Sequence, residues 1–237
     1  MTHPDGPSPR PLHAIIFDFD GVIADSERLH LRAYQDVLAE DGITFTPEEY
    51  YARYLGYDDA GMFRTLARDR ALEMNEERLA ELIARKANRY EDLTASGEML
   101  FPGAARFIRE AANAVPVAIA SGALTYEIEE VLDRAGLRDL FPVVVGADQT
   151  ERSKPDPEPY RFAFEKLRAA TGRDLDASRT VAIEDSRWGL DSARGAGLRT
   201  VAVTNTYTAD ELADAAELVV SGLEMVTLGA LDALCEG

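Results

Sequence analysis

The sequence predicts an α/β fold: a doubly wound parallel sheet with a smaller α-helical domain inserted after its first strand. Two observations support this prediction. From Phe101 onward, helix-like and strand-like segments alternate, which is typical of βαβ units and of a parallel sheet with helices on both faces. Between residues 26 and 97, by contrast, no segment has the character of a buried strand.

The first elements are expected to be one strand and four helices. The apolar run at 12–19 predicts a buried strand. Ser26 is a suitable N-cap for a helix that ends before Gly42. The capping box "TPEE", with proline at the first helical position, starts another helix at Thr46. Two further helical stretches are expected at 60–70 and 76–92.

The second part of the chain is expected to supply the rest of the sheet. Helices are predicted at 102–114, 126–136, 157–172 and 187–197. Strands are predicted at 115–121, 141–146, 179–186 and 199–205. The expected organisation is therefore a flexible proline-rich tail at 1–11, a core domain formed by 12–25 and 98–237, and a helical insertion at 26–97.

Composition excludes several classes of partner. Hydrophobic residues make up 46% of the 237 residues, which is enough for a sizeable core, and the net charge of −18 at pH 7 argues against nucleic-acid and anionic-membrane partners. No apolar run is long enough to span a membrane, and the N-terminal segment lacks the apolar centre of a signal peptide. Cys235 is the only cysteine, so no intrachain disulfide can form. We expect a cytoplasmic protein, for which a monomeric state is plausible.

Polar residues follow several predicted strands at the point where each strand ends. In an open parallel sheet, ligands bind beyond these carboxyl ends, so such residues should converge. Side chains two residues apart on a strand point the same way, roughly 6–7 Å apart, so Asp18 and Asp20 could address one ligand. The other strand ends and loops contribute Ser121, Gly122, Lys154, Glu184 and Asp185.

Four acids in a small volume repel one another unless a cation neutralises them, and Mg²⁺ prefers oxygen ligands of this kind. Lys154 and the Ser121 hydroxyl could then hold phosphate oxygens, and Gly122 would let the backbone approach them. Each feature alone also fits an ordinary turn or a solvated loop. Their combination, each just after a strand, favours a functional site.

The same segments resemble the four motifs of the haloacid dehalogenase superfamily. They read "DFDGV" at 18–22, "ASG" at 120–122, "SKPDPEPY" at 153–160 and "IEDS" at 183–186. The insertion at 26–97 resembles the helical cap of the β-phosphoglucomutase-like and phosphoglycolate-phosphatase-like branch. The resemblance therefore implies a Rossmann-like catalytic core with a cap domain, and an enzyme that transfers phosphoryl groups.

This resemblance implies a role for each candidate residue. Asp18 would be the nucleophile that forms an aspartyl-phosphate, and Asp20 would act as general acid and base. Asp18, the backbone carbonyl of Asp20 and Asp185 would hold Mg²⁺, with Glu184 bound directly or one layer further out. The phosphoryl group would be bound by Ser121, Gly122 and Lys154. In the cap, His30 and Lys86 match positions that address the substrate, although both also fit ordinary helix residues.

The expected activity is a Mg²⁺-dependent phosphatase acting on a small phosphorylated metabolite, such as a sugar phosphate or phosphoglycolate. A phosphosugar mutase is the alternative, but Asp58 and Asp59 stand where β-phosphoglucomutase has an arginine for a second phosphate. A non-enzymatic phospho-acceptor signalling module is disfavoured by the helical insertion and by Asp20. Trp188 is interpreted as a packing residue.

Overall fold

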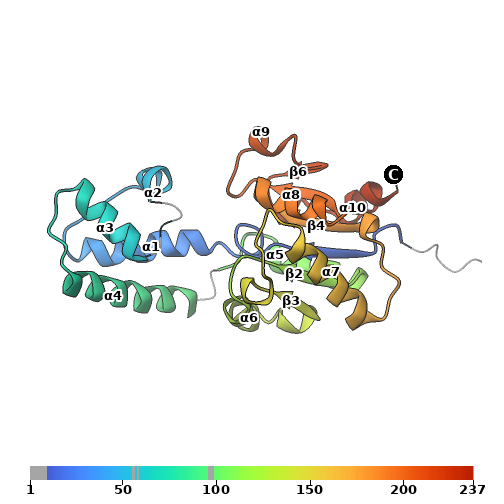
Figure 1. Cartoon of the computed structure of the whole chain (residues 1–237), viewed down its shortest axis with the longest axis horizontal. Helices are drawn as coiled ribbons and strands as arrows, with labels where there is room; N and C mark the ends of the chain where they lie inside the picture. Colours follow the sequence, from blue (N-terminus) through green and yellow to red (C-terminus); the bar gives the residue numbers. More distant parts are fainter. Residues whose placement is uncertain (1–9, 55–56, 58, 96–98, 237) are drawn as a thin grey trace, which may run out of the picture. The chain divides into compact units, whose positions relative to one another are not determined.

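The computed structural model describes residues 10–54, 57, 59–95 and 99–236. It divides the chain into two compact units, which are drawn in Figure 1. The helical unit comprises Ser26–Met99, and the sheet unit comprises the described residues on either side of it. Residues 1–9 of the predicted tail lie outside the described residues. Arg10 is described and pairs with Asp232 at 2.9 Å.

The sheet unit contains a sheet of six parallel strands in the order β3-β2-β1-β4-β5-β6. The strands are β1 Ala14–Phe17, β2 Val117–Ala120, β3 Val143–Val145, β4 Thr180–Glu184, β5 Arg199–Val203 and β6 Leu218–Val220. This order is that of a doubly wound sheet, so the predicted fold class is confirmed.

Strand β1 lies at the centre of the sheet, where the chain order reverses. Phe17, its last residue, is paired with Ile119 of β2 on one side and Ile183 of β4 on the other. The switch point of the sheet is therefore next to the carboxyl end of β1, which is where ligands of doubly wound sheets bind.

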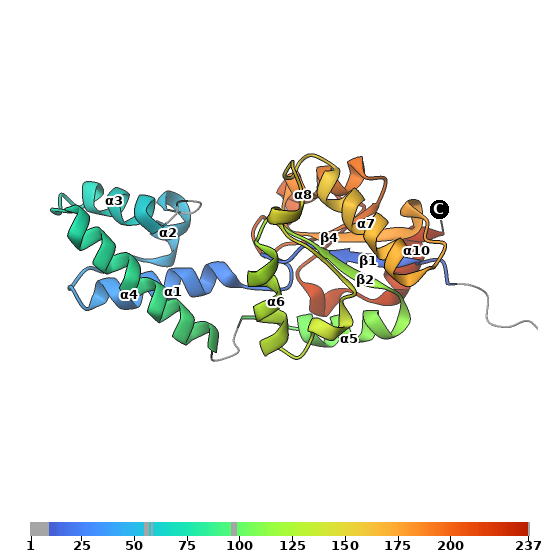
Figure 2. The same ribbon diagram turned by 60° about the horizontal axis from the view of Figure 1, so that its bottom comes forward.

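Helices cover both faces of the sheet, as Figure 2 shows. Helices α7 (Glu158–Thr171) and α8 (Arg187–Gly195) pack on one face. The other face is covered by α5 (Ala104–Ala114), α6 (Thr125–Arg134) and α10 (Leu228–Cys235). The remaining helical segments are α9 Ala209–Leu212 and the 3₁₀ turns Arg138–Leu140, Ala147–Gln149, Ala177–Arg179 and Leu223–Met225.

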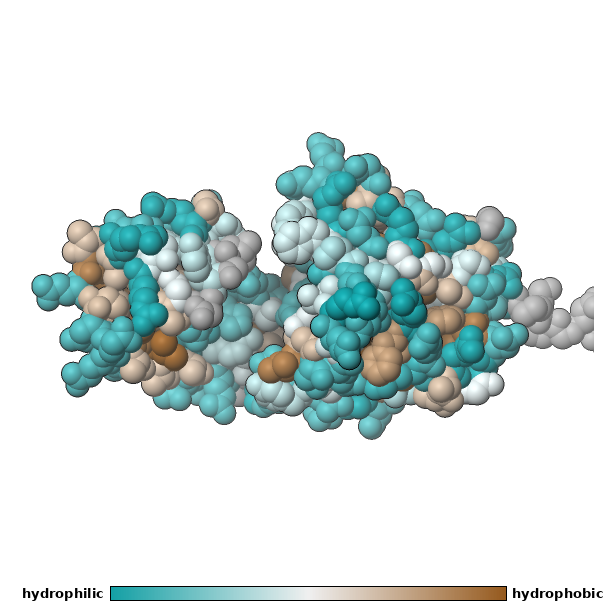
Figure 3. Space-filling view, in the orientation of Figure 1, coloured by the Kyte–Doolittle hydropathy of each residue, from teal (hydrophilic) through white to brown (hydrophobic). Residues whose placement is uncertain are grey.

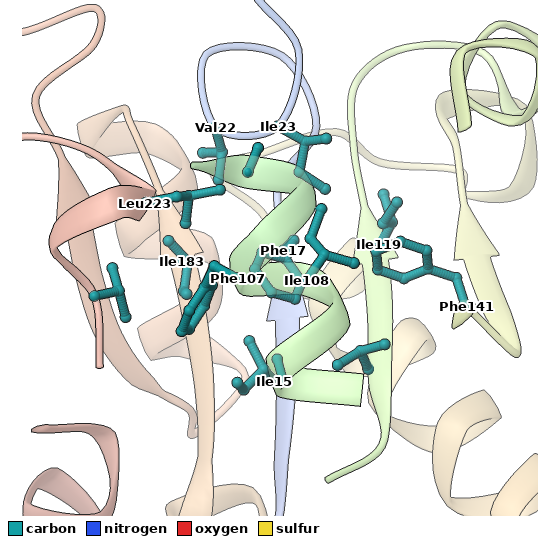
Figure 4. Packing of buried hydrophobic residues seen from close by; sticks show 14 of the residues in the cluster. Ile15, Phe17, Val22, Ile23, Phe107, Ile108, Ile119, Phe141, Ile183 and Leu223 are labelled. Carbon is teal, nitrogen blue, oxygen red and sulfur yellow. The ribbon is translucent and has the colours of Figure 1, made fainter. Parts of the chain in front are cut away.

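The two sheet faces have separate hydrophobic cores because alternate residues of each strand point to opposite sides. On one face, the Phe17 ring packs edge-on against Phe107 and Phe141, with ring centroids 6.1 Å apart in both pairs (Figure 4). On the other face, Ile16 packs with Tyr160 of α7. This packing on both sides fixes the strand that leads into Asp18.

The helical unit contains α1 Ser26–Ala39, α2 Pro47–Arg53, α3 Asp59–Asp69 and α4 Glu76–Ala95. Helix α4 packs against α1 and α3. The predicted N-cap of α2 is confirmed, because Thr46 Oγ1 accepts a hydrogen bond from the Glu49 backbone N–H at 3.2 Å. The unit has its own hydrophobic core, which includes Tyr34, Phe63 and Leu82.

The part of the sheet unit that follows β5 has no counterpart in the sequence prediction. It comprises helix α9, strand β6, the 3₁₀ turn Leu223–Met225 and helix α10. Strand β6 has only three residues, all of them half-buried, so its apolar run is too short to stand out from the surrounding polar sequence. The fold therefore extends the predicted five-stranded sheet by one edge strand.

The surface is largely hydrophilic on the face that Figure 3 shows, in keeping with the strongly negative net charge. Among the helices formed by the described residues, none combines the length and the apolar character needed to cross a membrane.

Candidate active site

The loop after β1 presents Asp18 at the switch point of the sheet. β1 ends at Phe17, two residues before the end of the predicted strand 12–19, and the Asp18 backbone N–H donates to the Ile183 carbonyl at 2.9 Å. The Phe19 carbonyl then accepts from three successive backbone N–H groups, the shortest from Ile23 at 2.8 Å. This tight turn holds the Asp18 backbone in place.

Gly21 is required in that turn for two reasons. Its φ is +76°, a left-handed conformation that favours glycine. A Cβ at this position would also lie 1.9 Å from Asp185 Oδ2. The Gly21 carbonyl accepts a hydrogen bond from the Asn205 side chain at 2.7 Å, which ties the turn to the end of β5. The glycine therefore allows Asp185 to approach the β1 loop.

Three buried acids converge at this edge of the sheet. Asp18, Glu184 and Asp185 each offer a carboxylate oxygen, and these atoms lie within 4.8 Å of one another. Asp20, the fourth acid expected here, is half-buried and lies outside this group of closely spaced oxygens. The expected separation of roughly 6–7 Å from Asp18 is larger than that spacing, so the place of Asp20 beside the three acids stays a prediction.

Lys154 is the cation of this cluster. Its Nζ lies 2.7 Å from Asp18 Oδ1 and 2.6 Å from Glu184 Oε1. Burial lowers the pKa of Lys154, but the two carboxylates outweigh burial, so its pKa is raised and it remains charged. One ammonium group thus faces three carboxylates.

The excess of negative charge appears in the pKa values of the acids. Burial, followed by repulsion from Glu184, raises the pKa of Asp18 well above its ordinary value. The same two causes raise the pKa of Asp185 to about 6, although a hydrogen bond from Thr206 opposes them. A further positive charge would relieve this repulsion.

Glu184 is held by hydrogen bonds on both of its carboxylate oxygens. Oε1 accepts from Lys154 and from the Tyr160 hydroxyl at 2.9 Å. Oε2 accepts from the backbone N–H groups of Asp185 and Ser186, and from the Ser186 hydroxyl. A Cβ at Gly189 would lie 1.8 Å from Oε1, so the glycine makes room for this carboxylate. Because both of its oxygens are engaged in these hydrogen bonds, Glu184 is better suited to orient Lys154 than to bind a metal directly.

The donor set fits a hard divalent cation. The available ligands are carboxylate oxygens, they are buried and close together, and they carry more negative charge than Lys154 balances. Mg²⁺ prefers such oxygen ligands and keeps several waters. Asp18 and Asp185 are the acids whose oxygens are least committed to the groups described above.

The loop after β2 places Ser121 on the neighbouring strand end. The Ser121 backbone N–H donates to Val145 at 2.9 Å, and its buried hydroxyl accepts from the Ala123 N–H at 3.1 Å. Asp148 accepts from both the backbone N–H and the hydroxyl of Thr125, which fixes the far end of this loop. Apart from Gly122 itself and its two neighbours in the chain, no atom of the described residues lies within 4 Å of where a Cβ of Gly122 would be, so the space beside this glycine is open.

The helical unit brings His30 and Lys86 together. Lys86 is 3% exposed, and its Nζ lies 2.8 Å from His30 Nδ1 and 2.6 Å from Asp59 Oδ1. The His30 ring stacks on Tyr90 at a centroid distance of 4.2 Å. Asp58, which the sequence analysis singled out together with Asp59, lies outside the described residues.

Sequence reasoning assigned no role to two residues that support the site. Tyr160, which contacts Glu184, is the last residue of the motif at 153–160, and Asn205, which contacts the Gly21 turn, is the last residue of the predicted strand 199–205. A packing or loop role is equally common at such positions. The interpretation of Trp188 as a packing residue is wrong, because its side chain is 72% exposed at the start of α8. The sequence of α8 alone does not reveal this exposure, because Trp188 is followed directly by the buried residues Gly189 and Leu190.

The fold and the site together define a doubly wound α/β protein whose carboxylate site lies at the switch point of its sheet. A sequence profile of the family described as haloacid dehalogenase-like hydrolase matches residues 15–203. The chain therefore belongs to the haloacid dehalogenase-like hydrolases, as its four motifs indicate.

Individual relatives agree with this assignment. The protein CbbY of Rhodobacter capsulatus is 32% identical over 232 residues, covering 94% of this chain and 99% of the relative. Hexitol phosphatase B of Escherichia coli K12 is 31% identical, covering 83% and 85%. A crystal structure of a CbbY variant from Rhodobacter sphaeroides in complex with xylulose-(1,5)bisphosphate has a TM-score of 0.68 and 30% identity, covering 93% and 99%. These similarities support a phosphatase.

Proposed function

We propose that this chain is a Mg²⁺-dependent phosphatase that hydrolyses a small phosphorylated metabolite, of the sugar phosphate or phosphoglycolate type, through an aspartyl-phosphate intermediate. The observation that carries the proposal is the buried contact of 2.7 Å between Asp18 and Lys154 at the switch point of the sheet. A carboxylate nucleophile beside a cation that can hold phosphoryl oxygens is what phosphoryl transfer needs.

In the first step, a carboxylate oxygen of Asp18 attacks the phosphorus atom of the ester. The bond from phosphorus to the ester oxygen breaks, and Asp20 donates a proton to the departing oxygen. In the second step, water attacks the phosphorus of the aspartyl-phosphate and gives its proton to Asp20. Inorganic phosphate leaves and Asp18 is regenerated, so one difficult displacement is divided into two easier ones.

The other residues position the phosphoryl group and neutralise charge. Lys154, which Glu184 orients at 2.6 Å, and the hydroxyl of Ser121 hold phosphoryl oxygens. The N–H of Gly122 would add a backbone donor, and the space where a Cβ of this glycine would lie is open. Asp18, the carbonyl of Asp20 and Asp185 would hold Mg²⁺. When bound, the ion supplies positive charge to the acids and to the transferring phosphoryl group.

In this proposal the sheet unit is the catalytic core and the helical unit is the cap that recognises the substrate. The proposal for the substrate class draws on the relatives: hexitol phosphatase B is named for a phosphorylated polyol, and the CbbY variant was solved with a sugar bisphosphate. Both compounds carry free hydroxyl groups beside their phosphate groups, which suits the polar side chains of His30 and Lys86 in the helical unit.

The test is phosphate release from p-nitrophenyl phosphate and from a panel of phosphorylated sugars, polyols and phosphoglycolate, in Mg²⁺ and in EDTA. The wild type should turn over in Mg²⁺ only. Asp18→Asn should fold and release no phosphate, because an amide cannot form the acyl-phosphate. Asp191→Asn is the matched control, since this acid lies on α8 with a side chain that is 54% exposed.

Two results would count against the proposal. Substantial turnover by Asp18→Asn would remove Asp18 from the role of nucleophile. A wild-type protein that takes up one phosphate and retains it would instead indicate a phospho-acceptor switch.

A further inference from the structure

The helical unit contains a pocket of its own. Its volume is about 620 Å³, within the range of ~300–1,000 Å³ that is usual for small-molecule sites. The lining includes the ionisable residues Glu27, His30, Asp59 and Lys86, together with the rings of Tyr34 and Tyr50. It thus combines aromatic walls with a few polar groups, as sites for small polar ligands do.

The only lysine of the pocket is already neutralised. Asp59 Oδ1 lies 2.6 Å from Lys86 Nζ, and the same oxygen accepts a hydrogen bond from the Tyr34 hydroxyl at 2.6 Å. The Lys86 ammonium also lies 4.8 Å from the centroid of the Tyr34 ring. Because the Lys86 side chain is 4% exposed, this pairing is sheltered from solvent.

The remaining groups do not add positive charge. Burial, followed by repulsion from Lys86, lowers the pKa of His30 to about 4, so its ring is neutral near pH 7. Glu27 accepts a hydrogen bond from the Tyr50 hydroxyl and contributes a second carboxylate to the lining. Two carboxylates against one ammonium leave the described lining of the pocket with a net negative charge.

Arginines of the helical unit do not correct this balance. No arginine is among the described residues that line the pocket. Arg53 pairs with Asp69 at 2.8 Å, and Arg64 pairs with Glu76 at 2.9 Å, so these two arginines of the helical unit have partners outside the pocket. A phosphate group, with its charge of about −1.5 to −2, would therefore be repelled. Hydroxyl groups would find both acceptors and donors.

We propose that Asp59 is a specificity-determining residue: by holding Lys86, it makes this pocket a site for the uncharged, hydroxyl-bearing part of a monophosphorylated sugar or polyol, and excludes a second phosphate. The inference rests on the proposed phosphatase function and names its substrate class. Removing the Asp59 carboxylate frees Lys86 to meet a second phosphate, so the selectivity of the enzyme should shift.

The test compares monophosphates with bisphosphates of xylulose, fructose and glucose, both as substrates and as competitive inhibitors of p-nitrophenyl phosphate hydrolysis. The wild type should prefer the monophosphate of each pair. Asp59→Asn should raise the bisphosphate-to-monophosphate ratio of kcat/KM, or of inhibitor affinity, by about tenfold or more. Glu76→Gln is the matched control: it also removes an ion-paired carboxylate of the helical unit, but an exposed one outside the pocket, and should leave the ratio unchanged.

A wild type that prefers the bisphosphates would overturn the inference, and so would a ratio that Asp59→Asn leaves unchanged. If Asp59→Asn does not fold, Asp59→Ser replaces it as the test variant. The preference of the wild type for monophosphates is measured without any variant. The two proposals fail differently. Absence of Mg²⁺-dependent p-nitrophenyl phosphate hydrolysis contradicts the phosphatase, whereas an active enzyme that favours bisphosphates contradicts only the role of Asp59.

Discussion

Asp185→Asn should stabilise the metal-free protein while it abolishes activity. Asp185 has a pKa of about 6 in the folded protein, against an ordinary value of 3.8, because it is buried next to Glu184. Each pKa unit corresponds to about 1.4 kcal/mol, so the ionised carboxylate destabilises the metal-free fold by roughly 3 kcal/mol once the pH exceeds both values. Asparagine carries no charge and can still accept the hydrogen bond from Thr206.

The pH dependence follows from the direction of the shift. Because the folded pKa lies above the unfolded one, the carboxyl group favours folding below about pH 4, and this contribution is lost as the pH rises through about 6. In EDTA, the variant should therefore exceed the wild type in free energy of unfolding by up to about 3 kcal/mol at neutral pH. The difference should shrink towards zero at about pH 4.

Urea denaturation followed by circular dichroism measures this difference in free energy of unfolding. If the two units unfold separately, calorimetry shows to which unit the difference belongs. Adding Mg²⁺ should stabilise the wild type and leave Asp185→Asn unchanged, because binding to the folded state alone raises stability. Asp191→Asn, on the surface of α8, should match the wild type throughout. The reasoning is refuted if Asp185→Asn is no more stable than the wild type in EDTA at neutral pH, or if Mg²⁺ stabilises both equally.

Three further predictions concern other residues. Asp20→Asn should accept phosphate from an activated ester but release it ~10²–10⁴-fold more slowly, seen as accumulating phosphoenzyme; unchanged turnover on a poor leaving group contradicts a general acid–base role. Lys154→Met removes the ammonium group that lies 2.7 Å from Asp18 and 2.6 Å from Glu184. This variant should lose about 3–5 kcal/mol of unfolding free energy, because two buried carboxylates then lack their cation. A loss below about 1 kcal/mol argues against the charge balance described. For His30, whose pKa is lowered from 6.5 to about 4, the unfolding free energy of the helical unit should fall as the pH drops from 6.5 to 4, because the unfolded chain takes up the proton first. His30→Phe should flatten this slope, and an equal slope in wild type and variant would mean that another group titrates.

The sequence was sufficient to locate the site of the sheet unit, because the order of strands and motifs along the chain determines which residues meet at one edge of the sheet. Lys154 and Asp18 are 136 residues apart, yet their side chains meet at 2.7 Å. Both were expected at one edge of the sheet because the carboxyl ends of parallel strands lie together, and a short motif marks each end. The alternation of helices and strands likewise gave the fold class, although the three-residue strand β6 was too short to be recognised.

The orientation of individual side chains was not predictable in the same way. The rule of alternation does not fix the directions of Asp18 and Asp20, because β1 ends at Phe17 and both residues lie in the loop beyond the strand. Glu184 could have been a metal ligand from its position alone. Only its hydrogen bonds with Lys154 and Tyr160 indicate that it orients the lysine.

The sequence by itself determined the family, the fold class and the set of acids and cations at the strand ends, because local apolar periodicity and motif order encode them. Only the tertiary structure decided which charges neutralise one another. Asp59 and Lys86 are 27 residues apart on α3 and α4, and their contact at 2.6 Å depends on how these helices pack. That packing is set by the shapes of buried side chains across the whole helical unit, such as Tyr34 and Phe63, whose combined effect no local pattern records.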